Sequence, residues 1–486
     1  MSPDLSAPNT RAIERARMRE VFERQQATAL RWRTASAAER GARIRTLLDA
    51  LLARRTEFHE AFRLDFRKPE AEVELSEFLP VVEEARLALR NLHRWMRPRA
   101  VRPTLAMLGT RAWVQWQPRG RALIIAPWNY PLSLCAGPLI SALAAGDPVI
   151  LKPSEMTPHV AAVLARVIGE SFPPEEVALF EGAEDTARAL LELPFEHIFF
   201  TGSPAVGKQV MAAAAEHLAS VTLELGGKSP AIVTPGADLA NAAETLMWGK
   251  FLNAGQTCIA PDHVYVHAGI RDDFVARCRA VLDARYGADA EARRANADFA
   301  RIVNARHAQR LVGLLDDAVQ RGARVLHGGE TDVAACYVAP TLLDHIPADA
   351  RIQHEEIFGP LLPVLPYESL DEVAAELDAR PKPLALYLWS TQRAEIDAFL
   401  ARTTSGGACI NHCVSHFAHG NLPFGGVNHS GLGKAHGRHG FETFSHERAV
   451  LRAPAWAPAR LFQPPYAAHR LRLIRCVVDA LRWLSR

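Results

Sequence analysis

Cys258 and Glu224 are the two residues of this sequence whose types and surroundings best suit covalent catalysis. Glu224 lies in VTLELGGKSP (221–230), at the end of a β-rich run, and Cys258 lies in FLNAGQTCIAP (251–261), after a polar turn. A helix-length segment that starts near Asp238 separates the two motifs, so both groups can reach one cleft. A thiol that attacks a carbonyl carbon and a carboxylate that activates water are what an acyl-enzyme route requires. Either residue alone is more often structural, because Cys is common in cores and Glu on surfaces.

Taken together, the two motifs resemble the signature sequences of the NAD(P)-dependent aldehyde dehydrogenase superfamily. The resemblance covers roughly residues 15–450. Within the superfamily, the motifs are most similar to those of the class 3-like branch, which includes fatty, aromatic and coniferyl aldehyde dehydrogenases. It implies oxidation of an aldehyde to its carboxylic acid with NAD(P). The further motifs that carry it, in the family's order, are PWNYP (127–131), LKPSE (151–155), FTGSPAVGK (200–208), EEIFGP (355–360) and LPFGGVNHSGLG (422–433).

The resemblance also implies a catalytic cycle. Cys258 adds to the aldehyde as a thiolate, and the side-chain amide of Asn129 and the backbone N–H of Cys258 hold the oxyanion. After hydride leaves for the nicotinamide ring, water that Glu224 deprotonates hydrolyses the thioester. Asn129 alone would be interpreted as a turn residue before Pro131, and Lys228, after the two glycines of the first motif, receives no role.

The expected cofactor is NAD, with NADP as the alternative, bound at the carboxyl ends of a doubly wound sheet. Gly202 and Gly207 lie in a turn that leads into a helix from about Ala205, and the amides of such a turn suit a pyrophosphate. The spacing is not GxGxxG, so a plain strand-to-helix turn is the alternative. The resemblance places Glu155 on the adenosine ribose, where a carboxylate repels a 2′-phosphate, and Glu356 on the nicotinamide ribose. The expected cofactor-binding residues are Trp128, Lys152, Glu155, Gly202, Ser203, Gly207, Glu356 and Phe358.

Alternating strands and helices are expected to position these residues. Residues 11 to about 96 show helical spacing, and short apolar runs that begin at Ala122 indicate buried parallel strands separated by helices at 133–145, 158–171 and 183–191. Four more strands are expected near 230–234, 263–267, 384–389 and 406–410. We therefore predict an α/β fold, aldehyde dehydrogenase-like, with two doubly wound parallel-sheet domains and a small extended oligomerisation element. The expected divisions are a disordered N-terminus (1–10), a cofactor-binding domain (11–223) with an arm at about 97–118, a catalytic thiol domain (224–415), a return and oligomerisation segment (416–455) and a basic amphipathic tail (456–486).

Composition narrows the function classes. The chain has 486 residues, 49% hydrophobic and 23% charged, with a net charge of +2, which argues against a dedicated nucleic-acid binder. Its seven Cys include no CxxC pair, and Cys409 and Cys413 are spaced CxxxC, so we expect reduced cytoplasmic thiols and no metal site. The N-terminus lacks the apolar core of a signal peptide, and no apolar run approaches the ~20 residues of a membrane span.

Two segments predict contacts beyond the active site. The arm around 100–118 and the segment 440–452 resemble the pieces that class 3-like enzymes use to pair subunits, so a homodimer is expected. In the tail, apolar residues at helical spacing alternate with arginines. A basic amphipathic helix of this kind can lie on an anionic membrane surface, and packing on its own dimer is the alternative. The apolar positions are Leu471, Ile474, Val478 and Leu481.

The sequence bears on three alternatives to hydrolytic aldehyde oxidation. A CoA-acylating relative would resolve the thioester with a thiol, but Glu224 is present and favours water. A phosphorylating relative would need a phosphate site that the sequence does not reveal. A non-catalytic relative would have damaged motifs, and none is damaged. The substrate entrance is expected near Tyr130, Trp248 and His416, which suggests an apolar aliphatic or aromatic aldehyde.

Overall fold

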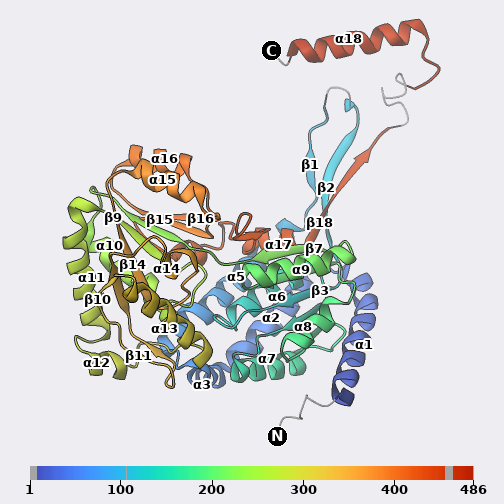
Figure 1. Ribbon diagram of the computed structural model, residues 1–486. Coiled ribbons are helices and arrows are strands. Elements are labelled where there is room, and N and C mark those ends of the chain that lie inside the picture. Colours follow the sequence, from blue (N-terminus) through green and yellow to red (C-terminus); the bar gives the residue numbers. More distant parts are fainter. Residues whose placement is uncertain (1–7, 105–106, 455–462, 485–486) are drawn as a thin grey trace.

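The chain has an α/β fold built on two parallel sheets, as the sequence predicts (Figure 1). The structure is a computed structural model that describes residues 8–104, 107–454 and 463–484. Helix α1 begins at Pro8, so residues 8–10 are helical and the expectation of disorder is wrong there, while residues 1–7 lie outside the described part. No helix in the described ranges is both long and apolar enough to cross a membrane.

The first sheet has six strands in the order β17-β7-β6-β3-β4-β5, and only β17 is antiparallel to its neighbour. The strand order reverses beside β3, and in such sheets ligands bind outside the carboxyl ends of the strands at that point. The motifs that contain Trp128 and Ser203 follow β3 and β6 there. The strands are β3 (Ala122–Ile125), β4 (Val149–Lys152), β5 (Val177–Leu179), β6 (His197–Thr201), β7 (Ser220–Glu224) and β17 (Gly431–Leu432).

Helices cover both faces of this sheet because consecutive residues of its central strands are apolar and buried, so that side chains on both faces need cover. Along β3, Ala122 and Ile124 pack beneath α2, α5, α6 and α7, and Leu123 and Ile125 pack beneath α1, α8 and α9. Helices α6 and α7 have the bounds expected from the sequence. The helices of this part are α1 (Pro8–Trp32), α2 (Ala37–Ala53), α3 (Arg55–Phe66), α4 (Glu70–Val73), a π-helical turn (Glu74–Phe78), α5 (Leu79–Trp95), α6 (Ser133–Ala145), α7 (Pro158–Ser171), α8 (Glu184–Leu191) and α9 (Pro204–Glu216).

The second sheet has seven strands in the order β10-β13-β14-β9-β8-β15-β16, and only β10 is antiparallel. Helices α10, α11 and α13 cover one face, and α15 and α16 cover the other. The strands are β8 (Pro230–Val233), β9 (His263–His267), β10 (Arg324–His327), β13 (Thr341–Asp344), β14 (Leu361–Tyr367), β15 (Ala385–Trp389) and β16 (Gly407–Ile410). The helices are α10 (Leu239–Phe251), α11 (Arg271–Tyr286), α12 (Ala290–Ala295), α13 (Ala305–Gln320), α14 (Arg351–His354), α15 (Leu370–Ala379) and α16 (Arg393–Arg402).

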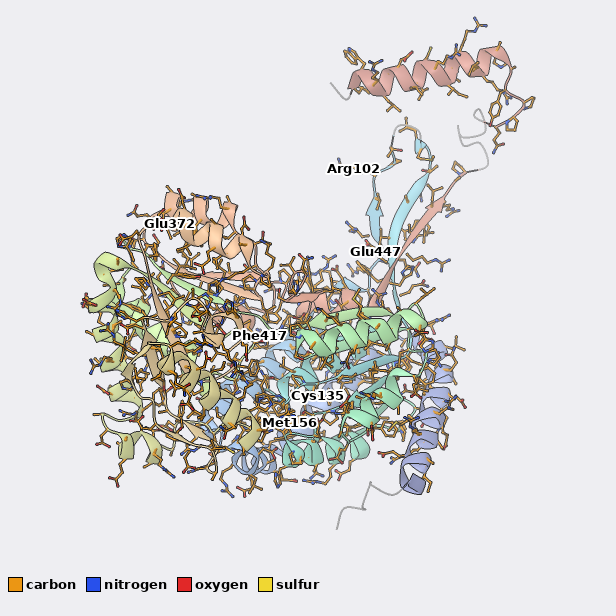
Figure 2. The ribbon with its side chains drawn as sticks, in the orientation of Figure 1. Arg102, Cys135, Met156, Glu372, Phe417 and Glu447 are labelled. Carbon is orange, nitrogen blue, oxygen red and sulfur yellow. The ribbon has the colours of Figure 1, made fainter. Side chains whose placement is uncertain are left out.

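An antiparallel arm projects from the first sheet's side of the molecule (Figure 1). It consists of β1 (Arg99–Val101), β2 (Arg111–Pro118) and β18 (Ser445–Arg452), and β18 pairs with β2 along its whole length. Arg102 and Glu447 lie on this arm, away from the packed interior that contains Cys135 (Figure 2). Helix α17 (Gly437–Thr443) precedes β18, and a small pair, β11 (Thr331–Asp332) and β12 (Tyr337–Val338), completes the strands.

The C-terminal segment forms helix α18 (Ala468–Leu484), as its apolar spacing predicts. The helix has no buried residue and stands apart from the body, beyond the arm (Figure 1). The connecting residues 455–462 and the last two residues lie outside the described part.

Candidate active site

Cys258 follows a bent segment at the end of α10. The helix runs into a 3₁₀ turn, Leu252–Gly255, in which Asn253 and Ala254 both have φ near 52°. Residues other than glycine rarely adopt this left-handed conformation, and it persists only where the surroundings hold it. Such strain often marks a functional site.

Side-chain amides hold this bent segment in place. Asn253 Nδ2 donates to the carbonyl of Asn129 at 2.9 Å, and Asn129 Nδ2 donates to the carbonyl of Gln256 at 3.0 Å. Gln256 in turn donates to the carbonyls of Asn253 and Arg301, and accepts from the backbone N–H of Val303. Asn129 is therefore fixed beside the loop that leads to the thiol. Its amide has a second N–H left to donate.

Glu224 is the last residue of β7 and lies opposite Gly431 of β17. The backbone N–H of Gly202 donates to the main-chain carbonyl of Glu224 at 3.0 Å, which joins the turn after β6 to the end of β7. The side chain is buried, and neither carboxylate oxygen has a hydrogen-bond partner among the described residues. Burial raises the pKa of Glu224 well above its usual value. The carboxyl group is thus free to bind water.

The thiol shares its surroundings with two carboxylates. Burial, together with the negative charges of Glu356 and Glu224, raises the pKa of Cys258 to about 12. The structure therefore brings Cys258, Glu224 and Glu356 into one site, with Asn129 bonded to the loop beside them. A thiol with so high a pKa is protonated at neutral pH, so it needs activation before it can attack.

Glu356 and Phe358 lie in one loop between α14 and β14. Burial raises the pKa of Glu356 to about 7, although a hydrogen bond from the backbone of Gly227 lowers it. The ring of Phe358 contacts that of Trp128, with centroids 5.3 Å apart. Phe358 has φ 48°, so it is a third residue at the site, after Asn253 and Ala254, with a left-handed backbone.

The remaining predicted cofactor residues lie at the carboxyl ends of β4 and β6. Lys152 forms an ion pair with Glu155 at 2.8 Å, and the Glu155 side chain is 42% exposed. Ser203 caps α9 by accepting from the backbone N–H of Val206, so its hydroxyl hydrogen stays available. An added Cβ on Gly202 or Gly207 would clash with this chain's own Phe200 and Leu225 side chains. These glycines thus serve packing of the turn as well as any phosphate.

The donor set suits a dinucleotide. Amides at the start of α9 fit a pyrophosphate, and the carboxylates of Glu155 and Glu356 fit ribose hydroxyls. Across residues 8–104, 107–454 and 463–484, no group of three His, Cys, Asp or Glu side chains could hold a metal ion.

Four polar residues of the site received no role from the sequence: Asn253, Gln256, Lys228 and Asp262. Asn253 and Gln256 lie within the thiol motif. Two amide side chains beside a glycine turn are a pattern that could predict a loop held by side-chain hydrogen bonds. Asp262 directly precedes the apolar strand β9, and a carboxylate at such a position must be buried with a partner. That partner is Lys228.

Comparisons with known proteins find similar chains along most of this sequence. A sequence model of the aldehyde dehydrogenase family matches residues 8–450. The chain is 40% identical over 423 residues to 4,4'-diaponeurosporen-aldehyde dehydrogenase of Staphylococcus aureus, covering 87% of this chain and 91% of the relative. It is also 40% identical over 450 residues to human aldehyde dehydrogenase family 3 member B1, covering 92% and 94%.

A solved structure resembles the whole fold. Staphylococcus aureus AldH in its substrate-bound state superposes with a TM-score of 0.90 at 38% identity. The match covers 95% of this chain and 99% of that one.

Proposed function

Because this chain belongs to the aldehyde dehydrogenase family, in its class 3-like branch, we propose that it oxidises its substrate through a thioester on Cys258. Members of the family are NAD(P)-dependent oxidoreductases, and the chain oxidises aldehydes to carboxylic acids with such a cofactor.

Cys258 is the nucleophile. Its thiolate sulfur bonds to the aldehyde carbon, and the carbonyl oxygen becomes an oxyanion that accepts hydrogen bonds from Asn129 Nδ2 and the Cys258 backbone N–H. Loss of one such donor costs ~10²–10³ in rate. When bound, the nicotinamide ring accepts the hydride that leaves this carbon. The lost hydride leaves a thioester on Cys258.

Glu224 is the base for hydrolysis. It takes a proton from a water molecule, whose oxygen attacks the thioester carbon, and the C–S bond breaks to release the carboxylic acid and the Cys258 thiolate. The observation that carries this assignment is the buried Glu224 carboxyl, with both oxygens unpartnered among the described residues, beside the thiol. A CoA-acylating enzyme would have no use for this group.

The cofactor roles follow the same reasoning. Glu155 and Lys152 hold the adenosine ribose, the turn at Gly202, Ser203 and Gly207 receives the pyrophosphate, and Glu356 takes the nicotinamide ribose. The rings of Trp128 and Phe358, which contact each other, line the nicotinamide end of the cofactor site. NAD is favoured over NADP because Glu155 presents a carboxylate at the adenosine ribose.

An apolar aldehyde is the favoured substrate. Cys258, Trp248 and Phe417 are partly buried and pack against the apolar core of the second sheet, to which Val414 and Phe424 belong. One relative is named for 4,4'-diaponeurosporen-aldehyde, which supports this choice.

The direct test compares two cysteine variants. Cys258→Ala should lose NADH formation from hexanal or benzaldehyde by at least about a thousandfold, whereas Cys476→Ala, which removes an exposed thiol in α18, should keep it. Turnover by Cys258→Ala at the wild-type rate would overturn the proposal.

The arm supports a homodimer. Within the described residues, its outer strands β1 and β18 each have one unpaired edge, and Val101 and Leu451 expose 44% and 54% of their surface. Exposed strand edges invite pairing. Light scattering should give twice the chain mass of 53.4 kDa; a monomer at micromolar concentration would contradict this.

The tail supports peripheral membrane contact of a cytoplasmic enzyme. All seven cysteines are free, which fits a reducing compartment. Helix α18 exposes Leu471, Val478 and Trp483 beside several arginines. Such a helix lies in an anionic membrane interface, and packing on the dimer is the alternative.

A further inference from the structure

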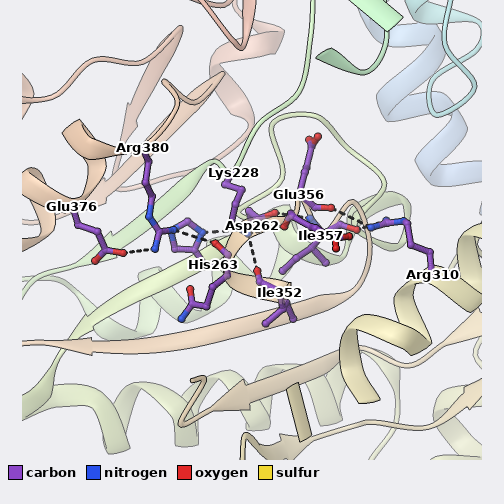
Figure 3. Close-up of polar contacts among 11 residues, drawn as sticks. Lys228, Asp262, His263, Arg310, Ile352, Glu356, Ile357, Glu376 and Arg380 are labelled. Carbon is purple, nitrogen blue, oxygen red and sulfur yellow. Dashed lines mark hydrogen bonds and ion pairs between the residues drawn. The ribbon is translucent and has the colours of Figure 1, made fainter. Parts of the chain in front are cut away.

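Lys228 bonds to the backbone of the loop that carries Glu356. Its ammonium donates to the carbonyls of Ile352 and Glu355, each at 2.9 Å, and forms an ion pair with Asp262 (Figure 3). Lys228 lies four residues after Glu224. The motif of the catalytic base is thus bonded directly to the loop of Glu356.

Asp262 holds the same loop from a second element. Its Oδ2 accepts the backbone N–H of Ile357 at 2.8 Å, and its own backbone N–H donates to Ser229. Burial alone would raise the pKa of Asp262, but the ammonium of Lys228 and the adjacent His263 hold it well below the usual range. The Asp262 side chain therefore stays ionised and paired.

Arg310 of α13 completes the attachment. Its guanidinium donates to the carbonyl of Glu356 at 3.2 Å and to that of Ile357 at 2.5 Å (Figure 3). Consecutive peptide groups beside Glu356 are thus bonded to charged side chains from three separate elements. These bonds can offset the free-energy cost of the next residue, Phe358, whose backbone is left-handed.

This loop packs closely against a glycine of each catalytic motif. An added Cβ on Gly226 would stand 2.4 Å from the Glu356 carboxylate oxygens, and one on Gly255 would stand 2.4 Å from the carbonyl oxygen of Gly359. The loop therefore contacts both the motif that contains Glu224 and the motif that contains Cys258. A small shift of its backbone would move the Glu356 carboxylate relative to both.

We propose that Lys228 and Asp262 are positioning residues whose ion pair fixes the Glu355–Ile357 backbone and so sets the Glu356 carboxylate for the cofactor's nicotinamide-side ribose. The inference rests on the proposed function in taking Glu356 as the ribose ligand. It assigns Lys228 to cofactor binding and hydride transfer, and not to thioester hydrolysis.

The test separates cofactor binding from chemistry at the thiol. NADH affinity is measured by fluorescence titration, without turnover. Hydrolysis of 4-nitrophenyl acetate, which forms an acetyl thioester on Cys258 and needs no cofactor, reports on Cys258 and Glu224 alone. The variants are Lys228→Met, Glu356→Gln and the two combined. Lys382→Met is the control, because among the described residues the ammonium of Lys382 pairs with Asp378 alone and bonds to no carbonyl of the loop.

Lys228→Met should raise the NADH dissociation constant about ten- to hundredfold, the usual effect of removing a group that orients a ligand. Ester hydrolysis should stay within about twofold of wild type, since it needs no Glu356. Adding Lys228→Met to Glu356→Gln should cost little more, because residues that act through one another are not additive. Lys382→Met should bind NADH as wild type does.

Three outcomes would overturn the inference. If Glu356→Gln weakens NADH binding but Lys228→Met does not, the ion pair does not position Glu356. If Lys228→Met slows ester hydrolysis as much as it weakens NADH binding, its role is general support of the fold. If Glu356→Gln itself leaves NADH binding unchanged, the assignment of Glu356 in the proposed function fails first.

A single replacement leaves a buried charge unpaired, which destabilises proteins. The variant Lys228→Met/Asp262→Asn removes both charges, and the asparagine oxygen can still accept from Ile357. This double variant carries the same prediction if Lys228→Met does not fold.

Discussion

The carboxylate of Glu356 lies against the Cα of Gly226, so closely that a Cβ there would stand 2.4 Å from both carboxylate oxygens. Gly226→Ala should therefore displace the Glu356 side chain and weaken NAD binding, by about tenfold or more. Gly169→Ala is the matched control, because Gly169 lies in α7 and its added Cβ would meet nothing within 4 Å. A titration that gave Gly226→Ala the wild-type affinity would show that Glu356 does not need this position.

Glu155 should set the choice between NAD and NADP. Glu155→Gln removes the charge that repels a 2′-phosphate and releases Lys152 from its ion pair. We expect the NAD:NADP ratio of kcat/KM to fall about ten- to hundredfold, as for the loss of a hydrogen bond to a charged group. Glu184→Gln, which removes an exposed carboxylate paired with Arg188, is the control. An unchanged ratio in Glu155→Gln would remove Glu155 from cofactor discrimination.

The fold was largely predictable because local signals and the final packing agree. The bounds expected for α6 and α7 match the structure, since apolar runs and flanking glycine or proline mark them clearly. Strand β14 was missed, because it contains Pro363 and Pro366 and prolines argue against a central strand. The strand pairs with β13 only up to Pro363 and with β9 only from Val364 onward, so each half bonds to one neighbour and tolerates a missing donor. Strands β10 and β13 were missed along with it.

Site residues could be predicted only where they belong to a recognisable sequence motif. Cys258, Glu224 and Glu356 stand in motifs, and the structure brings them together. The role of Lys228 could not be predicted, because its partners are backbone carbonyls more than a hundred residues away and a carboxylate that follows the thiol motif. A sequence records side-chain types, but it does not show which main-chain groups a fold leaves without partners.

The reactivity of Cys258 should rise steeply with pH in the absence of cofactor. The pKa of the thiol is raised to about 12, so the thiolate fraction is small at neutral pH and grows about tenfold for each pH unit. Alkylation by iodoacetamide, measured in the Cys476→Ala background to remove an exposed thiol, should rise in this way from about pH 6 to pH 9. A plateau below pH 8 would contradict the buried, protonated thiol.

Binding of NAD⁺ should shift that profile to lower pH. An opposite charge near a titratable group favours its charged form, and the nicotinamide of NAD⁺ is positive whereas that of NADH is neutral. Alkylation at pH 7 should therefore be faster with NAD⁺ than with NADH. Equal rates would place the nicotinamide away from the sulfur.

Helix α18 should carry any membrane affinity of the protein. Deletion of residues 466–486 should abolish sedimentation with vesicles of anionic phospholipid at low salt, while oxidation of soluble aldehydes continues. Replacing Arg470, Arg472 and Arg475 with glutamine should weaken binding to anionic vesicles, since basic side chains supply the electrostatic attraction. Equal binding by the intact and truncated proteins, or none by either, would favour a tail packed on the dimer.

The acyl-enzyme route through Cys258 and Glu224 is tested most directly by the intact mass of Glu224→Gln after mixing with NAD and an aldehyde. If Glu224 activates the hydrolytic water, the variant should form the thioester, fail to release it, and gain the mass of one acyl group. Digestion should locate that mass on Cys258, and Glu224→Gln/Cys258→Ala should gain none. Glu224→Gln that turns over at the wild-type rate and shows no added mass would contradict the route.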